Sequence, residues 1–582
     1  MARRLIDLEG SPKSGWIKVS NALENIFSEN EKWPEWRGEL YLELHRGTYT
    51  TQSAVKRYNR KLEFALRNTE LFSVIAMLEN DTPYPHDRFL KNWKPLLTNQ
   101  FHDVIPGSSI TRVYDEAKEA YRTIEADLAD LSQNIMKKFT GFPLENGSAD
   151  KVSNYSIRVF NDLSWEREDP LSIPAGLLQG VTALKTENDS IYPVQFYTAL
   201  DGSETAVFCP SVPSLGWITL FPAEKSQTSS FFSFRGNNLK TPFYEVNFDE
   251  AGRIVSLFDL NRKRELTSPG GVLNGFVSAQ DVPIAWEAWD IEADWKHYLT
   301  EETRLISTEI SASGPVCFKI RRKYKIGEAS VLTQDTVFYT TTARIDFETF
   351  VDWHEKRRLL KVQFDTNIYT TQMRCEIQYG HLLRNTHQNL PQDRARFEFC
   401  AHKWVSLEEE GGGIALLNDC KYGHDADCGS VRLTLLRSPI APDPEADQGE
   451  HRFTYSLLPF TGSFGESGVV RRSYELNSPA KAEPAFTETQ DYSLFWVEGD
   501  NIIAETVKAV EPYIENSGKK FVIRLYESLG GPASAAIHFN KPLVYAAESD
   551  MLEENRKELP KAGEDIYLEF RAFEIKTIIV GF

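Results

Sequence analysis

The sequence predicts a mainly β protein with an N-terminal α-helical section, in which a three-helix bundle precedes several β-sandwich domains. Before Gly141, apolar residues recur at three- and four-residue steps, which is the period of amphipathic helices. After Gly141, short alternating segments follow one another at intervals of roughly 8 to 15 residues, a pattern typical of β-sandwiches. The chain has 582 residues. One hydrophobic core serves only ~250 to 300 residues, so we expect three or four domains.

The first 35 residues are predicted to be a connector without a core of its own. Gly10, Pro12 and Gly15 interrupt it early. Residues 20–33 then predict a short amphipathic helix with Ser20 as its N-cap.

Three longer helices are predicted over residues 51–78, 86–98 and 108–137. A Pro-rich break at residues 82–85 separates the first two. The third helix carries a single apolar face, made of Val113, Tyr114, Ala117, Tyr121, Ile124, Leu128, Leu131 and Ile135.

Strands are predicted from residue 156 onward. A turn near residues 226–238 separates a first small sandwich from a longer run of strands, and residues 566–582 predict a strong strand pair at the end. The predicted division is 1–35 connector and end of a preceding domain, 36–140 helical domain, 150–235 small β-sandwich, 236–470 large β-sandwich domain and 471–582 C-terminal β domain. The early strands are expected at 156–161, 171–175, 193–200, 205–210, 216–222, 243–249 and 253–259.

Composition excludes several classes of partner. The formal net charge is −19 and the chain has no long Lys/Arg run, so we expect no nucleic-acid partner. No apolar run reaches the ~18 residues of a membrane span, and the N-terminus lacks the apolar core of a secretory signal, so we expect no membrane partner and a cytoplasmic location. The scattered cysteines, none in a C-x-x-C pair, indicate a reducing compartment.

The segment 39–51 is the first that can carry chemistry. Leucines alternate there with Tyr41, Glu43 and His45, and in a strand these three polar side chains would share one face. Glu43 would then be a candidate general acid, provided that burial or a neighbouring carboxylate raises its pKa. The alternative is a solvated carboxylate on a surface strand.

The second segment, residues 97–110, joins the second and third helices. His102 and Asp103 stand there between Phe101 and the apolar pair Val104 and Ile105. Imidazole is a good zinc ligand, and a neighbouring carboxylate can orient the ring or bind sugar hydroxyls. One histidine is not a metal site, however, and the alternative is a helix-capping arrangement.

Residues 280–295 place Trp286, Trp289 and Trp295 among carboxylates that include Asp290. Aromatic rings beside carboxylates are typical of carbohydrate subsites, although interleaved tryptophans also fill cores. The histidines and aspartates of residues 376–387 and 419–429 are expected on turn-like, exposed loops.

Several long motifs together resemble the class II α-mannosidases of glycoside hydrolase family 38, in particular their cytosolic and vacuolar branch with its bacterial relatives. The motifs are GELYLELHRGTYTTQ, NRKLEFALRNTE, LLTNQFHDVIPGSSI, GGIALLNDCKYG and LRSPIAPDPEADQGEHRFTY. The resemblance runs from near residue 1 to the C-terminus. It implies a retaining glycosidase that removes non-reducing α-mannosyl residues from oligosaccharides with a zinc ion and two carboxylates.

The resemblance also implies roles for individual residues. His102 corresponds to a zinc ligand, Asp103 to a sugar contact and Glu43 to the acid/base carboxylate, although other branches carry Asp there. As substrate-binding residues it implies Trp286, Asp290, Arg384 and His387.

The family's N-terminal (β/α) barrel, with its His-x-Asp zinc pair and nucleophilic Asp, has no counterpart in residues 1–35. We therefore expect a truncated or split chain that is inactive by itself, lacks tight zinc and needs an N-terminal catalytic half as partner. A homo-oligomer is a further expectation. The alternatives are a non-catalytic carbohydrate-binding protein made of β-sandwiches and a non-functional remnant.

Overall fold

The computed structural model describes residues 2–29, 32–141, 156–178, 180–224, 231–486, 490–512 and 519–582. The chain divides into two units, Met1–Leu42 and Glu43–Phe582. The first unit contains α1 (Ala2–Leu5) and α2 (Val19–Glu29). The short helix expected near residue 20 is present, but it begins before Ser20, which is therefore not its cap. Residues 30 and 31 of that prediction lie outside the described residues.

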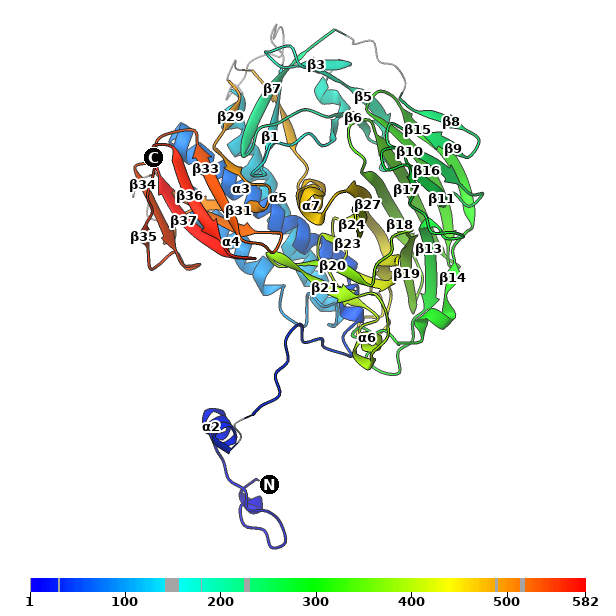
Figure 1. Cartoon of the computed structure of the whole chain (residues 1–582), viewed down its shortest axis with the longest axis vertical. Helices are drawn as coiled ribbons and strands as arrows, with labels where there is room; N and C mark the ends of the chain where they lie inside the picture. Colours follow the sequence, from blue (N-terminus) through cyan, green and yellow to red (C-terminus); the bar gives the residue numbers. More distant parts are fainter. Residues whose placement is uncertain are drawn as a thin grey trace. The chain divides into compact units, whose positions relative to one another are not determined.

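The second unit begins with a helical bundle formed by α3 (Ser53–Asn80), α4 (His86–Thr98) and α5 (Thr111–Thr140). The predicted apolar face of α5 is the buried one, from Tyr114 to Ile135. The helices α3 and α5 end where Asp81 and Gly141 take left-handed backbone conformations, a common helix stop. The helices share one apolar core with strands of the C-terminal sheets, which Figure 1 shows beside α3 and α4.

A small sandwich follows the bundle. One sheet has the order β28-β1-β7-β3-β4, with β29 on β7, and the facing sheet has the order β2-β6-β5. Residues 481–485 and 492–493 thus return to pair with β1 and β7, respectively. The strands are β1 (Ser156–Asn161), β2 (Leu171–Pro174), β3 (Ala183–Lys185), β4 (Ile191–Pro193), β5 (Gln195–Thr198), β6 (Glu204–Phe208), β7 (Gly216–Pro222), β28 (Lys481–Ala485) and β29 (Tyr492–Ser493).

The large β region consists of two antiparallel sheets, ordered β22-β25-β26-β19-β13-β11-β10-β9-β8 and β15-β16-β17-β18-β27-β24-β23-β20-β21. The two sheets face one another (Figure 1). Between them, Phe347 packs on Phe364 at 5.8 Å, and Asn274 donates a hydrogen bond to Gln334.

The first of these sheets contains β8 (Ser233–Arg235), β9 (Asn238–Lys240), β10 (Tyr244–Phe248), β11 (Ile254–Asp259), β12 (Arg264–Glu265), β13 (Leu273–Gln280), β14 (Thr300–Glu301), β19 (Arg358–Asp365), β22 (Phe399–Cys400), β25 (Gly423–Asp427) and β26 (Ser430–Arg437). The second contains β15 (Leu305–Ser313), β16 (Cys317–Ile326), β17 (Ser330–Tyr339), β18 (Ile345–Trp353), β20 (Gln372–Ile377), β21 (Gly380–Asn385), β23 (Trp404–Glu409), β24 (Gly412–Asn418) and β27 (Gly449–Thr461).

Two further sheets form the C-terminal region, ordered β30-β33-β36 and β31-β32-β37-β34-β35. The two strands expected in residues 566–582 are present but do not pair with each other. The turn Arg571–Glu574, with Phe573 at positive φ, carries the chain from one sheet to the other. The strands are β30 (Phe495–Glu498), β31 (Ile502–Ala509), β32 (Lys520–Glu527), β33 (Ala533–Phe539), β34 (Tyr545–Ser549), β35 (Lys557–Glu558), β36 (Asp565–Phe570) and β37 (Ile575–Gly581).

The predicted fold class is confirmed, with a helical section followed by β-sandwich layers. The division into domains stays a prediction. Its boundary at residue 150 and residues 226–230 of the predicted turn lie outside the described residues. Among the described helices, none combines the length and the apolar composition that a membrane-spanning helix requires.

Candidate functional site

The connection between α4 and α5 lies at the end of the bundle where α3 and α5 begin. Lys56, in the first turn of α3, donates from Nζ to the carbonyl oxygens of Thr51 at 2.5 Å and Ile105 at 2.9 Å. Gly107 has a φ of +90°, and a Cβ at this position would overlap the Thr51 carbonyl. This connection is therefore held closely against the residues that precede α3.

A buried carboxylate, that of Asp447, also fixes the start of α3. Asp447 accepts hydrogen bonds from the backbone N–H groups of Gln52 and Ser53 at 2.8 and 2.7 Å, where α3 begins. Loss of solvation by burial lowers the pKa of Lys56 and raises the pKa of Asp447. Because Lys56 and Asp447 both have hydrogen-bond partners, their burial leaves neither group unpaired.

His102 and Asp103 lie on the solvent side of this connection. His102 Nε2 is 3.5 Å from Asp103 Oδ2, and the two side chains are 76 % and 58 % exposed. The Phe101 ring packs at 4.2 Å from the imidazole. The C-cap of α4 is Asn99 and the N-cap of α5 is Ile110, so the His-Asp pair caps neither helix. The pair is free to meet a ligand or another polypeptide from outside.

Glu43 and Asp290, 247 positions apart in the sequence, lie on either side of one arginine. Arg46 Nη1 is 3.2 Å from Asp290 Oδ2, and its Nη2 is 3.9 Å from Glu43 Oε2. The Asp290 side chain is 15 % exposed and the Glu43 side chain 62 %. The Arg46 guanidinium also lies 4.4 Å from the centre of the Phe397 ring. Arg46 therefore fixes Asp290, whereas Glu43 stays accessible.

The turn that carries Trp286 is locked onto η1 (Gly47–Tyr49). The carbonyl of Trp289 accepts hydrogen bonds from the N–H groups of Gly47 at 2.8 Å and Thr48 at 3.2 Å. A side chain at Gly47 would overlap the guanidinium of Arg437. Trp286 itself is largely exposed, and its ring meets that of Trp289 edge-on at 5.5 Å. The exposed ring of Trp286 thus belongs to the same turn as Asp290, whose backbone N–H donates to the Trp286 carbonyl at 3.2 Å.

His387 is connected to the same region by α6 (Pro391–Ala395). Its Nδ1 lies 3.4 Å from Asp393 Oδ2, and the carbonyl of Ala395 accepts a 2.9 Å hydrogen bond from Arg46 Nη2. Arg384 is buried instead. Its Nη1 donates to the Cys400 carbonyl at 2.7 Å, and the guanidinium lies over the Phe399 ring.

The structure thus brings Glu43 and Asp290 to Arg46, and it places Trp286 and His387 in the two segments that contact this arginine. Arg437, Thr51 and Lys56 link this region to the His102 connection. The residue predictions stay predictions, because geometry alone tests none of their roles.

Sequence reasoning missed Arg46 and Arg437. Fully buried Arg437 donates to Thr51 Oγ1 at 3.0 Å and to the Asp290 carbonyl, and its Nε is 2.6 Å from Asp281 Oδ2. The only local signal for either residue is the charge of Arg46 beside His45.

Two expectations about local structure were wrong. Residues 39–46 are not a strand: they are irregular, with a turn at residues 43 and 44, because Leu44 has a φ of 67°, which breaks an extended chain. His381, His424 and Asp425 are not on exposed loops, since all three are buried in β21 and β25. Lys361 and Arg432 each lie 2.8 Å from an Asp425 oxygen and compensate its buried charge.

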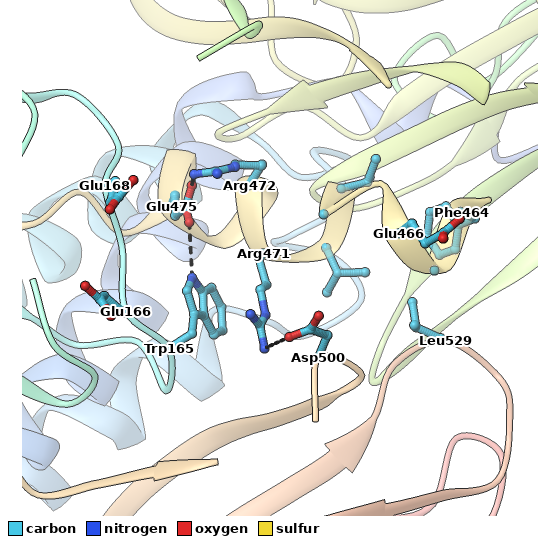
Figure 2. Close-up of a pocket in the computed structure, with 14 residues that line it drawn as sticks. Trp165, Glu166, Glu168, Phe464, Glu466, Arg471, Arg472, Glu475, Asp500 and Leu529 are labelled. Atoms are coloured by element: carbon cyan, nitrogen blue, oxygen red, sulfur yellow. Dashed lines mark hydrogen bonds and ion pairs between the residues drawn. The ribbon is translucent and has the colours of Figure 1, made fainter. Parts of the chain in front are cut away.

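The cavity drawn in Figure 2, of about 400 Å³, contains none of the predicted site residues. It lies beside α7 (Val469–Asn477). Trp165 Nε1 donates to Glu475 at 3.1 Å, and Arg471 pairs with Asp500 at 3.1 Å (Figure 2). Arg471 Nε has no hydrogen-bond partner among the described residues, but the other named groups pair with one another, so this cavity makes a poor candidate site.

A second cavity, of about 450 Å³, is lined in part by Glu70 of α3, by Trp93 of α4 and by Gln100 of the connection between α4 and α5. Buried Glu70 accepts a 3.1 Å hydrogen bond from Trp93 Nε1. Burial raises the pKa of Glu70 from 4.5 to about 7. Between these pH values the folded protein holds a proton that the unfolded chain has released, so stability falls as the pH rises through this window.

We expect Glu70→Gln to remove this pH dependence. Glutamine carries no charge, so the free energy of unfolding of the variant should exceed that of the parent by about 3 kcal/mol at pH 8 and by less than about 1 kcal/mol at pH 5. Unfolding temperatures at both pH values measure the effect, with Glu119→Gln on the exposed face of α5 as the control. A stabilisation that is the same at pH 5 and pH 8 would contradict a raised pKa.

No group of three or more His, Cys, Asp or Glu side chains in the described ranges is arranged to hold a metal ion. At the bundle end, the described residues offer one imidazole and one neighbouring carboxylate. Catalytic zinc takes three protein ligands, so these residues do not form a zinc site on their own.

Comparison with known families matches three segments in order. Residues 43–139 match the family described as "Alpha mannosidase middle domain". Residues 239–445 match "Glycosyl hydrolases family 38 C-terminal domain", and residues 501–578 match "Glycosyl hydrolases family 38 C-terminal beta sandwich domain".

Curated relatives match almost the whole chain. "Alpha-mannosidase 2C1" of Homo sapiens is 33 % identical over 99 % of this chain and 54 % of its own length. "Alpha-mannosidase G" of Dictyostelium discoideum is 30 % identical over 98 % of this chain and 55 % of its own length. The chain thus spans about half the length of the curated relatives it matches.

A solved structure shares the fold. The crystal structure of an alpha-mannosidase from Enterococcus faecalis V583 superposes with a TM-score of 0.78 at 16 % identity, covering 97 % of this chain and 72 % of that one. The three segments and the shared fold lead to one assignment. The chain belongs to glycoside hydrolase family 38, of which it carries the middle domain, the C-terminal domain and the C-terminal β-sandwich domain.

Proposed function

We propose that this chain is the middle and C-terminal portion of a retaining α-mannosidase that removes non-reducing α-mannosyl residues from oligosaccharides. One observation carries the proposal. The exposed His102–Asp103 pair lies within the matched middle domain and is linked through Lys56 and Thr51 to the region that holds Glu43. The names of the curated relatives support the substrate class.

In this proposal the chain supplies part of an active site. Glu43 is the acid/base carboxylate: it gives a proton to the glycosidic oxygen as the bond to the leaving sugar breaks, and later takes a proton from the attacking water. The nucleophilic carboxylate, which forms the covalent glycosyl intermediate, comes from an N-terminal catalytic domain that acts as the partner of this chain. Asp103, Trp286, Asp290 and His387 bind the sugar. Arg384 is buried in β21, and it supports the segment that leads to His387.

His102 is the single zinc ligand that we assign to this chain. The described residues of this chain do not complete a zinc site. We also place the protein in a reducing cytoplasm. All six cysteines lie in the described residues, and no disulfide joins any of them.

The proposal is tested by complementation. The purified chain and a purified N-terminal catalytic domain of a family 38 α-mannosidase are assayed separately and mixed, with an aryl α-mannoside as substrate. We expect little hydrolysis from either part alone and clear hydrolysis from the mixture, lost on chelation and restored by zinc. Full activity of the chain alone, or a stable but inactive complex with zinc present, would contradict the proposal.

A further inference from the structure

A cavity of about 330 Å³ lies between the end of β13 and η3 (Trp295–Tyr298). The sequence singled out this stretch for its aromatic rings and carboxylates, but Trp286 and Asp290 do not line the cavity. Its walls are formed by other residues of the same stretch. Ligand pockets have volumes of ~300 to 1,000 Å³, so this one suits a single small ring.

The negative charge of the lining residues excludes an anionic ligand. Asp281, Glu292 and Asp294 contribute carboxylates, and no lysine, arginine or histidine is among the described lining residues. Trp295 and Tyr298 contribute rings. Lys361 Nζ lies 4.5 Å from the centre of the Trp295 ring, whereas Tyr298 is 54 % exposed. The available stacking surface is therefore Tyr298.

Three buried polar atoms of the lining residues lack hydrogen-bond partners among the described residues: the acceptors Asp281 Oδ1 and Oδ2 and the donor Trp295 Nε1. Asp281 Oδ2 forms the ion pair with Arg437, which leaves Asp281 Oδ1 and Trp295 Nε1 for a ligand. Both side chains are almost fully buried, and leaving such atoms unpaired is unfavourable. A hydroxyl group both donates and accepts, so a ligand rich in hydroxyls can satisfy the two atoms.

The charge balance opposes a metal ion as the ligand. Arg437 Nε lies 2.6 Å from Asp281 Oδ2 and already neutralises that carboxylate. The backbone N–H of Ile284 donates to Glu292 at 2.8 Å. Within the described ranges the cavity residues are not among any metal-holding group. Carboxylates beside an exposed ring suit the hydroxyls and the apolar face of a sugar.

Arg437 connects this cavity to the candidate active site. The same guanidinium that faces Asp281 donates to Thr51 Oγ1 and to the Asp290 carbonyl. The Arg437 side chain would therefore connect a sugar bound in the cavity with Asp290, the ion-pair partner of Arg46.

We propose that the cavity between β13 and η3 is a second sugar-binding subsite, which holds one pyranose ring of the oligosaccharide through Tyr298, Asp281 and Trp295. The identity of the ligand as part of the substrate rests on the proposed function. The binding itself does not, because it requires only residues of this chain.

Binding of methyl α-D-mannopyranoside to the purified chain tests the subsite, measured by saturation-transfer NMR and calorimetry. Tyr298→Ala should weaken binding about two- to tenfold, the range expected for loss of one stacking contact. Asp294→Asn provides a second exposed cavity variant and should also weaken binding. Tyr369→Ala, which removes an exposed tyrosine outside the cavity, is the matched control and should leave binding unchanged. Near-UV circular dichroism checks that each variant is folded.

Three outcomes would overturn the subsite. They are no binding up to the solubility limit of the sugar, equal binding by the parent and both cavity variants, and binding that is lost in His102→Ala but retained in Tyr298→Ala. The last result would place the sugar at the candidate active site alone. If complementation fails while Tyr298→Ala still weakens sugar binding, the proposed function falls and the subsite stands.

Discussion

His102→Ala is expected to lower the α-mannosidase activity of the complemented enzyme more than about 100-fold, because loss of partners that only orient a metal ligand already costs 10- to 100-fold. The imidazole is exposed and packs on Phe101, so its removal should leave the fold unchanged. The measurement is kcat/KM of the mixture of the chain and the N-terminal domain, with the zinc content of the complex determined in parallel.

A second exposed His-Asp pair in the chain provides a matched control. His354 Nε2 is 2.8 Å from Asp352 Oδ1, and both side chains are about half exposed. His354→Ala should keep the activity and zinc content of the parent. If His102→Ala keeps full activity while binding its partner normally, the ligand assignment is wrong.

The helices were predictable because their signal is local. Each of α3, α4 and α5 begins and ends within about three residues of its predicted limits, since burial of one helix face imposes a period that can be read from the sequence. The same reasoning failed at residues 39–46. Alternating leucines predict a strand only when a neighbouring strand pairs with them, and none does so among the described residues.

The candidate site was predictable only in part, because its contacts join distant segments. His102 and Asp103 were found from their own motif. Arg46 and Asp290 are separated by 244 positions, and no local pattern relates them. The burial of Asp425 was also hidden, because its compensating charge on Lys361 lies 64 positions away. A turn-like composition therefore suggested exposure, whereas long-range pairing made burial possible.

Arg437→Ala is expected to be the most destabilising substitution near the site. The change leaves the Asp281 carboxylate buried without its counter-charge and removes a donor from Thr51 and Asp290. Breaking a buried ion pair from one side costs about 3 to 5 kcal/mol. Because a chain with several domains does not unfold in one step, the effect should appear in the transition that includes the large β region.

Hydrogen exchange locates the effect. In Arg437→Ala, the amides of residues 47–51 and 286–290 should exchange faster, because these two segments are joined through the lost guanidinium. The control is Arg112→Ala, whose exposed guanidinium forms an i,i+4 pair with Glu116 and should contribute less than about 0.5 kcal/mol.

A double variant separates the cost of the unpaired charge from the loss of packing. If Asp281 is destabilising because it is left charged and buried, adding Asp281→Asn to Arg437→Ala should restore part of the lost stability. The two changes would then be non-additive, as expected for groups in direct contact. Two outcomes would show that Arg437 does not hold the two segments together through its charge. One is that Arg437→Ala is as stable as Arg112→Ala, and the other is that Asp281→Asn lowers the stability of Arg437→Ala by as much as it lowers that of the parent.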